Sequence, residues 1–153
     1  MKWKQPPDIK IYEALGAVAD GRVSEQGSTA RVYSSSGNKY YDVEYDASAG
    51  AIMTNDNGSY WKGYLGYPAI AYLMQVGVLS YDSILGSLLK NIAWKDINTK
   101  FKNDFTKTLE FITKDFSSED RDSLAHYIRK IQEEIEVLGL TLLGKKKAPP
   151  QGY

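Results

Sequence analysis

The sequence contains no cysteine and only one histidine, His126. The absence of cysteine excludes disulfide bonds, thiolate nucleophiles and zinc or iron–sulfur centres ligated by cysteine. It also fits a cytoplasmic protein, which is the location we expect. A single histidine argues against a transition-metal site, because such sites combine several histidine or cysteine ligands.

An excess of charge of either sign is also missing, because 19 basic residues balance 19 acidic ones. Proteins that bind DNA without sequence preference usually carry a basic excess, since neutralising phosphates supplies their affinity. Zero net charge therefore argues against nucleic acid as the main partner. No apolar run approaches the roughly 18 residues that a membrane span needs, and the first ten residues lack the apolar core of a secretory signal. We expect no membrane association.

What the chain does contain is typical of one globular domain, with 153 residues of which 42% are hydrophobic and 25% charged. We predict a single α+β domain over residues 1–144. The basic, Pro/Gly-rich end, residues 145–153, is predicted to be a disordered tail.

The richest local signals lie in residues 28–76. Tyr41, Val43 and Tyr45 alternate with three carboxylates, a period of two that is typical of a strand with one buried face. A turn at 35–38 joins this strand to one that begins near residue 31, and a third strand follows at 51–53. Residues 22–28 are predicted to be a loop. The result is a small antiparallel sheet over about 29–54.

Helices are predicted before and after this sheet in the sequence. Asp8 is placed to cap an N-terminal helix that ends at Gly21. Pro68 begins a helix over 68–76 that is apolar nearly all round, so we expect it to be buried at the centre of the domain. The C-terminal half reads as helical, with a short helix capped by Ser80 and one long helix over about 95–115.

The last predicted helix follows a cap at Ser117 and carries apolar residues in alternating steps of four and three, typical of a heptad seam. These residues are Leu124, Ile128, Ile131, Ile135, Leu138 and Leu142. Gly139 falls within the pattern and is a candidate end for the helix. The seam needs an apolar partner, which is either the 97–116 face of the preceding helix or a second chain.

The carboxylate row Asp42, Glu44 and Asp46 is one candidate site, which Asp56 joins from the next loop. Oxygen ligands of this kind suit Mg²⁺ or Ca²⁺, and they support a divalent-metal-dependent hydrolase or nuclease as an alternative function. The other interpretation is a solvated sheet face that discourages edge-to-edge pairing.

A second candidate is an aromatic segment punctuated by glycine. It comprises Tyr60, Trp61, Lys62, Tyr64 and Tyr67. Its rings suit stacking on a protein partner or on bases, with Lys145–Lys147 as a basic tail in the nucleic-acid alternative. The competing interpretation is that the rings fill the core beside the helix at Pro68.

A family resemblance covers residues 28–76. Residues 32–37 followed by Tyr41-Asp42-Val43 resemble the hairpin that leads into SWIM-type zinc fingers, and residues 69–73 resemble the helix that follows their ligands. Residues 55–57 stand near the first ligand pair, and Gly66-Tyr67-Pro68 stands where Cys-x-His would be, so all four zinc ligands are absent. The resemblance implies a ββα module in which aromatic packing replaces zinc. It also implies a role in binding DNA or protein.

No catalytic constellation emerges from these patterns. We therefore predict a small interaction module without catalytic activity or cofactor, which binds a protein partner or a second copy of itself. The metal-dependent hydrolase or nuclease and the nucleic-acid-binding protein are the alternatives.

Overall fold

The computed structural model describes residues 1–151 and has an α+β fold. The helices are α1 (Asp8–Ala19), α2 (Tyr67–Gln75), α3 (Ser83–Leu88), α4 (Trp94–Lys100), α5 (Phe105–Thr113) and α6 (Ser118–Leu138), with a π-helical turn η1 (Gly58–Lys62). The strands are β1 (Val23–Gln26), β2 (Thr29–Tyr33), β3 (Tyr40–Asp46), β4 (Ala51–Thr54) and β5 (Thr141–Leu142).

The five strands form one sheet in the order β1-β2-β3-β4-β5. The first four are antiparallel neighbours, and β5 joins β4 in parallel. The prediction of a loop over 22–28 is wrong, because Val23 pairs with Val32 and begins β1. Val23 is the only buried residue of β1, and the other three are exposed and polar. The strand therefore lacks the alternation of apolar and polar residues that would have identified it in the sequence. The alternation predicted for β3 is confirmed, since Tyr41 and Val43 are buried.

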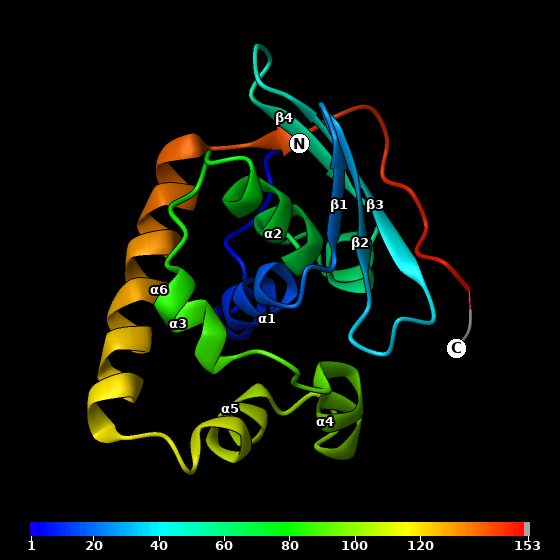
Figure 1. The fold of residues 1–153 in the computed structure, drawn as a ribbon. Helices are drawn as coiled ribbons and strands as arrows, with labels where there is room; N and C mark the ends of the chain where they lie inside the picture. The colour runs from blue at the N-terminus through cyan, green and yellow to red at the C-terminus, as the bar shows by residue number, and fades with distance from the viewer. Residues whose placement is uncertain (152–153) are drawn as a thin grey trace.

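Helices α1 and α2 form the central layer, between the sheet and α6 (Figure 1). Residues 69–74 of α2 are buried on all sides, as predicted, and Pro68 stands in its first turn. Helix α1 is equally enclosed, with every residue from Ile11 to Ala17 buried. The predicted cap at Asp8 is wrong, because Pro7 holds the N-cap position without a side-chain hydrogen bond. Asp8 instead accepts a hydrogen bond of 3.0 Å from Gln132 Nε2.

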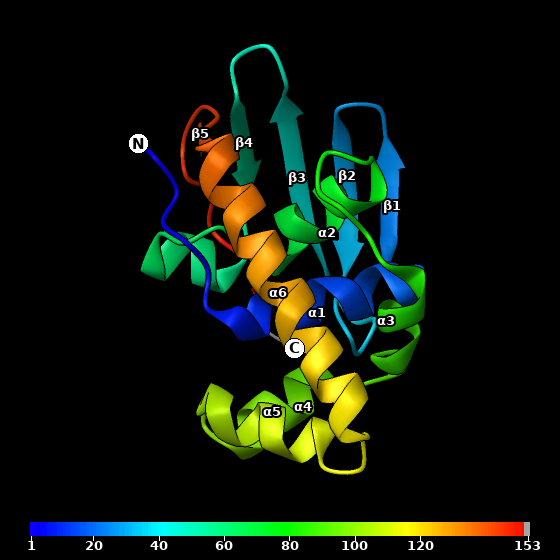
Figure 2. The same ribbon diagram turned by 90° about the vertical axis from the view of Figure 1, so that its left-hand side faces the viewer.

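Helix α6 crosses the far side of this central layer (Figure 2). Ser117 caps it by accepting a hydrogen bond from the Asp120 amide, and Gly139 ends it with φ of 54°. The seam packs inside the chain, where α6 contacts α1 and α3. The predicted hairpin of α6 with residues 97–116 is therefore not its main contact. Leu142, the last predicted seam residue, lies in β5.

The region predicted as one helix over 95–115 is two helices, α4 and α5, at one end of the molecule (Figure 2). Lys102 and Asn103 have φ of 53° and 61°, a left-handed conformation that breaks the helix. The predicted cap at Ser80 is also wrong. Asp82 caps α3, while Ser80 bonds to Glu134 through its amide and its hydroxyl.

The segment after β5 runs along the outer side of the sheet without helix or strand as far as residue 151 (Figure 1). Lys146 Nζ donates to the Tyr60 carbonyl at 3.3 Å, and Lys147 pairs with Glu44 at 3.5 Å. The predicted tail extends to residues 152–153, which lie outside the described residues. Within residues 1–151, no helix combines the length and apolar character needed to cross a bilayer.

Candidate functional site

The predicted carboxylate row lies on the outward face of β3. Asp42, Glu44 and Asp46 are partly exposed. Glu44 pairs with Lys147, while Asp46 closes the following turn by accepting hydrogen bonds from the Ser48 hydroxyl and the Ala49 amide. These bonds also lower the pKa of Asp46, the one from Ser48 having the largest effect.

Asp56, the fourth predicted ligand, is buried among other partners. Its carboxylate accepts hydrogen bonds from the Thr54 and Ser59 hydroxyls, both at 2.8 Å, and from the Ser59 amide at 3.1 Å. Across residues 1–151, no three His, Asp or Glu side chains are grouped closely enough to hold a metal ion.

The predicted aromatic segment lies partly on the surface and partly in the wall of a pocket. Trp61 is 71% exposed and stands against Tyr60 with ring centroids 4.7 Å apart. Tyr64 and Tyr67 are partly buried. Both of them, with Trp61 and Lys62, line one pocket, whereas Tyr60 does not. The π-helical turn η1 forms part of its rim, and such turns are rare and are frequently found at functional sites.

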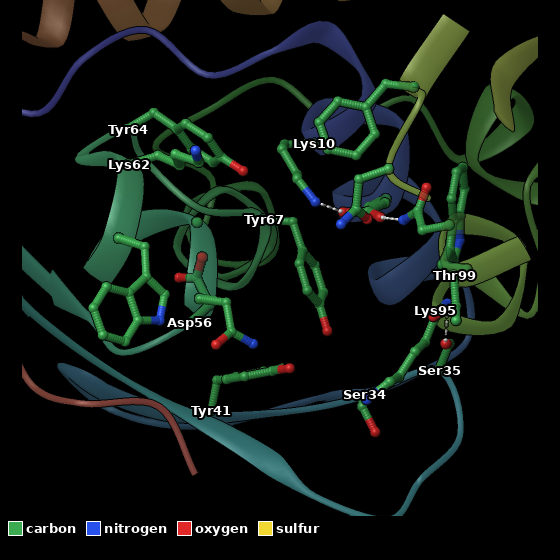
Figure 3. A pocket seen from close by; sticks show the side chains of 18 of the residues that line it. Lys10, Ser34, Ser35, Tyr41, Asp56, Lys62, Tyr64, Tyr67, Lys95 and Thr99 are labelled. Atoms are coloured by element: carbon green, nitrogen blue, oxygen red, sulfur yellow. Dashed lines mark hydrogen bonds and ion pairs between the residues drawn. The ribbon is translucent and has the colours of Figure 1, made fainter. Parts of the chain in front are cut away.

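This pocket has a volume of about 760 Å³ and brings together parts of the chain that are far apart in sequence. Its walls come from α1, the β2–β3 hairpin, η1, the start of α2, α4 and the start of α5 (Figure 3). The Lys10 ammonium group and the hydroxyls of Tyr67 and Tyr41 point into it from three different elements. A volume of this size falls within the range of pockets that bind small molecules.

A buried polar network crosses the pocket between α1 and α4. Glu13 is 4% exposed; one carboxylate oxygen pairs with Lys10 Nζ at 3.1 Å, and the other accepts from Asn98 Nδ2 at 2.6 Å. Burial alone would lower the pKa of Lys10, but the attraction of Glu13 raises it overall. The lysine therefore keeps its charge inside the cavity, where its ammonium group also lies 4.8 Å from the centroid of the Phe105 ring.

Arg22 and two tyrosines form the opposite wall. Arg22 pairs with Asp20 at 3.2 Å and donates to the Tyr33 carbonyl at 2.8 Å, which leaves its side chain 11% exposed. Tyr41 and Tyr67 meet edge to face, with ring centroids 6.0 Å apart. Burial raises the pKa of the Tyr67 hydroxyl, although the adjacent Arg22 guanidinium partly opposes this through its charge and through a side-chain contact with the hydroxyl. Burial is also the main cause of the raised pKa of Tyr41.

Close packing holds the floor of the pocket in place. A Cβ atom at Gly66 would collide with the Asp56 carboxylate, and one at Gly58 would collide with the Tyr64 ring. Glycine at these two positions lets the backbone approach those side chains. Asp56, the start of η1 and the start of α2 are thereby fixed relative to one another.

Three residues that line the pocket carry a buried polar atom without a hydrogen-bond partner. Over residues 1–151, the buried side-chain atoms in this state are Arg22 Nη2, Trp94 Nε1, Asn98 Oδ1 and Thr108 Oγ1. Three belong to residues that line the pocket. Trp94 Nε1 faces α1, where a Cβ at Gly16 would lie 2.8 Å away. Arg22 Nη2 and Asn98 Oδ1 remain, and buried polar groups of this kind normally have a partner.

The pocket lining carries more positive than negative side chains. The cations are Lys10, Arg22, Lys62 and Lys95, and the carboxylates are Glu13 and Asp56. The Ser35 hydroxyl accepts from the Lys95 amide at 3.1 Å, which ties α4 to the hairpin turn. Lys39 lies over the Tyr41 ring at 5.8 Å. Burial lowers the pKa of Lys95 and the positive charge of Lys39 lowers it further, while the Asp96 carboxylate opposes both effects, so Lys39 and Asp96 both lie near Lys95.

Sequence reasoning missed most of this site, including Lys10, Glu13, Arg22 and Asn98. One signal was available, since Glu13 stands in a helix whose neighbouring positions 11–17 are otherwise apolar or small. Glutamate is almost never fully buried without a partner. Its charged partner, Lys10, is three positions away on the same helix, a spacing that can be recognised in the sequence. Its second partner, Asn98, is 85 positions away, so no local pattern points to it.

The comparisons with known proteins match residues 3–141 to the family described as "Uncharacterised conserved protein UCP014422". Since the match covers most of the chain, the protein belongs to this family. Neither curated proteins nor solved structures give a match. The resemblance of residues 28–76 to SWIM-type fingers stays a prediction, because none of these comparisons bears on it.

Proposed function

We propose that the protein binds a small polar molecule in the pocket between α1, the β2–β3 hairpin, η1 and α4. The observation that carries this proposal is the presence of two buried polar atoms without partners, Arg22 Nη2 and Asn98 Oδ1, in the wall of a cavity of about 760 Å³. A ligand that accepts from the guanidinium and donates to the amide would satisfy both. Leaving a buried polar group unsatisfied costs about 1–3 kcal/mol, which such a ligand would recover.

The remaining lining suits the same task. Trp61 and Phe105 offer aromatic surface for the ligand's apolar part, and hydroxyl groups of tyrosine and serine surround the polar part. Ligand pockets commonly combine apolar walls with a few well-placed polar groups. The chemistry supports recognition rather than turnover, because Glu13 and Asp56, the buried carboxylates of the lining, already accept hydrogen bonds from the protein.

The test is a thermal-shift screen of the full chain against polar metabolites, followed by calorimetric titration of the compounds that raise the melting temperature. Thr99 is exposed on α4 and lines the pocket, so Thr99→Trp fills the cavity without disturbing the core. Thr106→Trp is the matched control, because Thr106 is exposed on α5 outside the lining. We expect binding that Thr99→Trp abolishes and Thr106→Trp preserves. Binding that survives Thr99→Trp unchanged would refute the proposal.

A second candidate keeps the sequence-based prediction of a cytoplasmic module that binds a protein or a second copy of itself. The observation that favours it is Trp61, which is 71% exposed at the pocket rim. Tryptophan is enriched among residues that dominate binding energy at interfaces. Sedimentation of the wild type and Trp61→Ala with a candidate partner, and of each alone, tests this function. Equal association by both chains would count against Trp61 as the contact.

A further inference from the structure

We infer that the ligand carries an oxyanion, a carboxylate or a phosphate, which is seated at Arg22 in the proposed pocket. This inference rests on the proposed function and names the chemical group that the pocket recognises. The site is built from Arg22 Nη2 and the Tyr67 hydroxyl, with Lys95 and Ser35 at its edge.

The guanidinium is already oriented for this role. Its Nε and Nη1 atoms are engaged by Asp20 and by the Tyr33 carbonyl, at 3.2 and 2.8 Å. These two hydrogen bonds hold the planar group in one orientation and leave its third nitrogen, Nη2, as the donor that has no partner. Arginine is the residue best suited to carboxylate and phosphate groups, because its planar donors match their oxygen atoms.

The charge around Arg22 points to an anion rather than to a neutral acceptor. Asp20 pairs with Arg22 from outside the lining, and within the lining the cations Lys10, Arg22, Lys62 and Lys95 outnumber the carboxylates Glu13 and Asp56. A cleft with an excess of one sign of charge attracts ligands of the opposite sign. An oxyanion next to Arg22 would be favoured by this excess.

Tyr67 adds a neutral donor to the same place. Because burial raises its pKa, the hydroxyl keeps its proton at neutral pH and can donate it to an anion. Tyr41 and Tyr67, whose rings pack edge to face in the pocket wall (Figure 3), also provide aromatic surface. A small aromatic acid or aromatic phosphate therefore combines both features of this wall.

Three probes of similar size separate the alternatives, namely phenyl phosphate, benzoate and the uncharged benzyl alcohol. The readout is the indole ¹H–¹⁵N resonances of the three tryptophans. Trp94 lines the pocket, whereas Trp3 Nε1 donates to the Ile52 carbonyl and serves as an internal control. We expect phenyl phosphate or benzoate to shift the Trp94 resonance saturably without moving that of Trp3. The tighter of the two identifies the oxyanion.

Two substitutions assign the interaction to its residues. Arg22→Gln should weaken binding of the preferred anion by about tenfold or more, because it removes a charge-assisted hydrogen bond. Tyr67→Phe keeps the ring and the fold, and should weaken the same probe by roughly threefold to tenfold. Arg31→Gln is the matched control, since Arg31 is exposed on the other face of the sheet, and it should bind as the wild type does.

The possible failures are distinguishable. If benzyl alcohol shifts Trp94 as strongly as the anions do, the pocket binds ligands but recognises no oxyanion, and only this inference is overturned. If Arg22→Gln and Tyr67→Phe both bind the anion with wild-type affinity, the oxyanion does not sit at Arg22. If none of the probes shifts Trp94 and the metabolite screen finds no binding that Thr99→Trp abolishes, both proposals are wrong.

Discussion

Glu13 and Asn98 are joined by a hydrogen bond of 2.6 Å although 85 positions separate them in the chain. The bond connects the buried helix α1 with α4 and defines one wall of the pocket. The second oxygen of Glu13 pairs with Lys10, so a carboxylate, an amide and an ammonium group form a single buried network. Its integrity determines the shape of the cavity.

Breaking the Lys10–Glu13 pair should destabilise the protein strongly. Lys10→Met leaves the Glu13 charge buried, with its 3.1 Å partner removed. The loss of one member of a buried pair costs about 3–5 kcal/mol. We expect a decrease of this order in the free energy of unfolding measured in urea.

The double substitution Lys10→Met with Glu13→Gln is the control for that prediction. Glutamine keeps an acceptor for Asn98 and carries no charge, so the double variant should be more stable than the sum of the two single effects implies. Strictly additive effects would show that the two side chains do not interact.

The contact between Gly66 and Asp56 predicts a conditional effect. Gly66→Ala introduces a Cβ atom that collides with the Asp56 carboxylate, and overpacking of this kind costs about 1–3 kcal/mol. In an Asp56→Ala background the carboxylate is absent, so the same substitution should cost almost nothing. Urea unfolding of the four chains measures both values, and an equal cost in the two backgrounds would rule out the collision.

Tyr67 should contribute to unfolding at high pH. Burial raises its pKa in the folded chain above the ordinary value of 10.0, while the unfolded chain releases this proton near that value. The contribution to stability is therefore complete below pH 10. It is lost as the pH rises further, by about 1.4 kcal/mol per pH unit.

Tyr67→Phe removes this ionisation. After correction for any difference in stability at pH 7, the midpoint of alkaline unfolding should therefore lie at higher pH for Tyr67→Phe than for the wild type. Circular dichroism between pH 9 and 12 follows the transition. Tyr33→Phe is the control at an exposed tyrosine. A midpoint that moves equally in both variants would contradict the assignment to Tyr67.

Glycine at the left-handed break between α4 and α5 should stabilise the protein. Lys102 has φ of 53°, which costs a residue with a Cβ atom about 1 kcal/mol. Lys102→Gly removes that strain and should raise the free energy of unfolding by a few tenths to about 1 kcal/mol. Asp96→Gly, at an exposed position inside α4, should lower it by about 0.5–1 kcal/mol. Thermal denaturation distinguishes the two, and a loss of stability for both would argue against the left-handed turn.

Elements with a strong local pattern were predictable from the sequence. The alternation around Tyr41 and Val43 located β3, and the apolar run after Pro68 located α2. The break after α4 was missed because the helical spacing of Ile97, Phe101 and Phe105 continues through it, with neither glycine nor proline at 102–103.

The short strands were missed for a different reason. β5 has two residues and exists because it pairs with Ala51 and Ile52 of β4, a contact that only the folded chain creates. The pocket follows the same rule. Tyr64 and Tyr67 were singled out by their aromatic clustering, but Glu13, Arg22 and Asn98 acquire their role only through partners distant in sequence.

A crystal structure of the full chain soaked with the tighter-binding of phenyl phosphate and benzoate locates the oxyanion directly. We expect density for the probe in the pocket between α1, η1 and α4, with one of its anionic oxygens within hydrogen-bond distance of Arg22 Nη2 and the Tyr67 hydroxyl. Density for the probe only on the outer face of the sheet, with Arg22 Nη2 still unpartnered, would show that the oxyanion is not seated at Arg22.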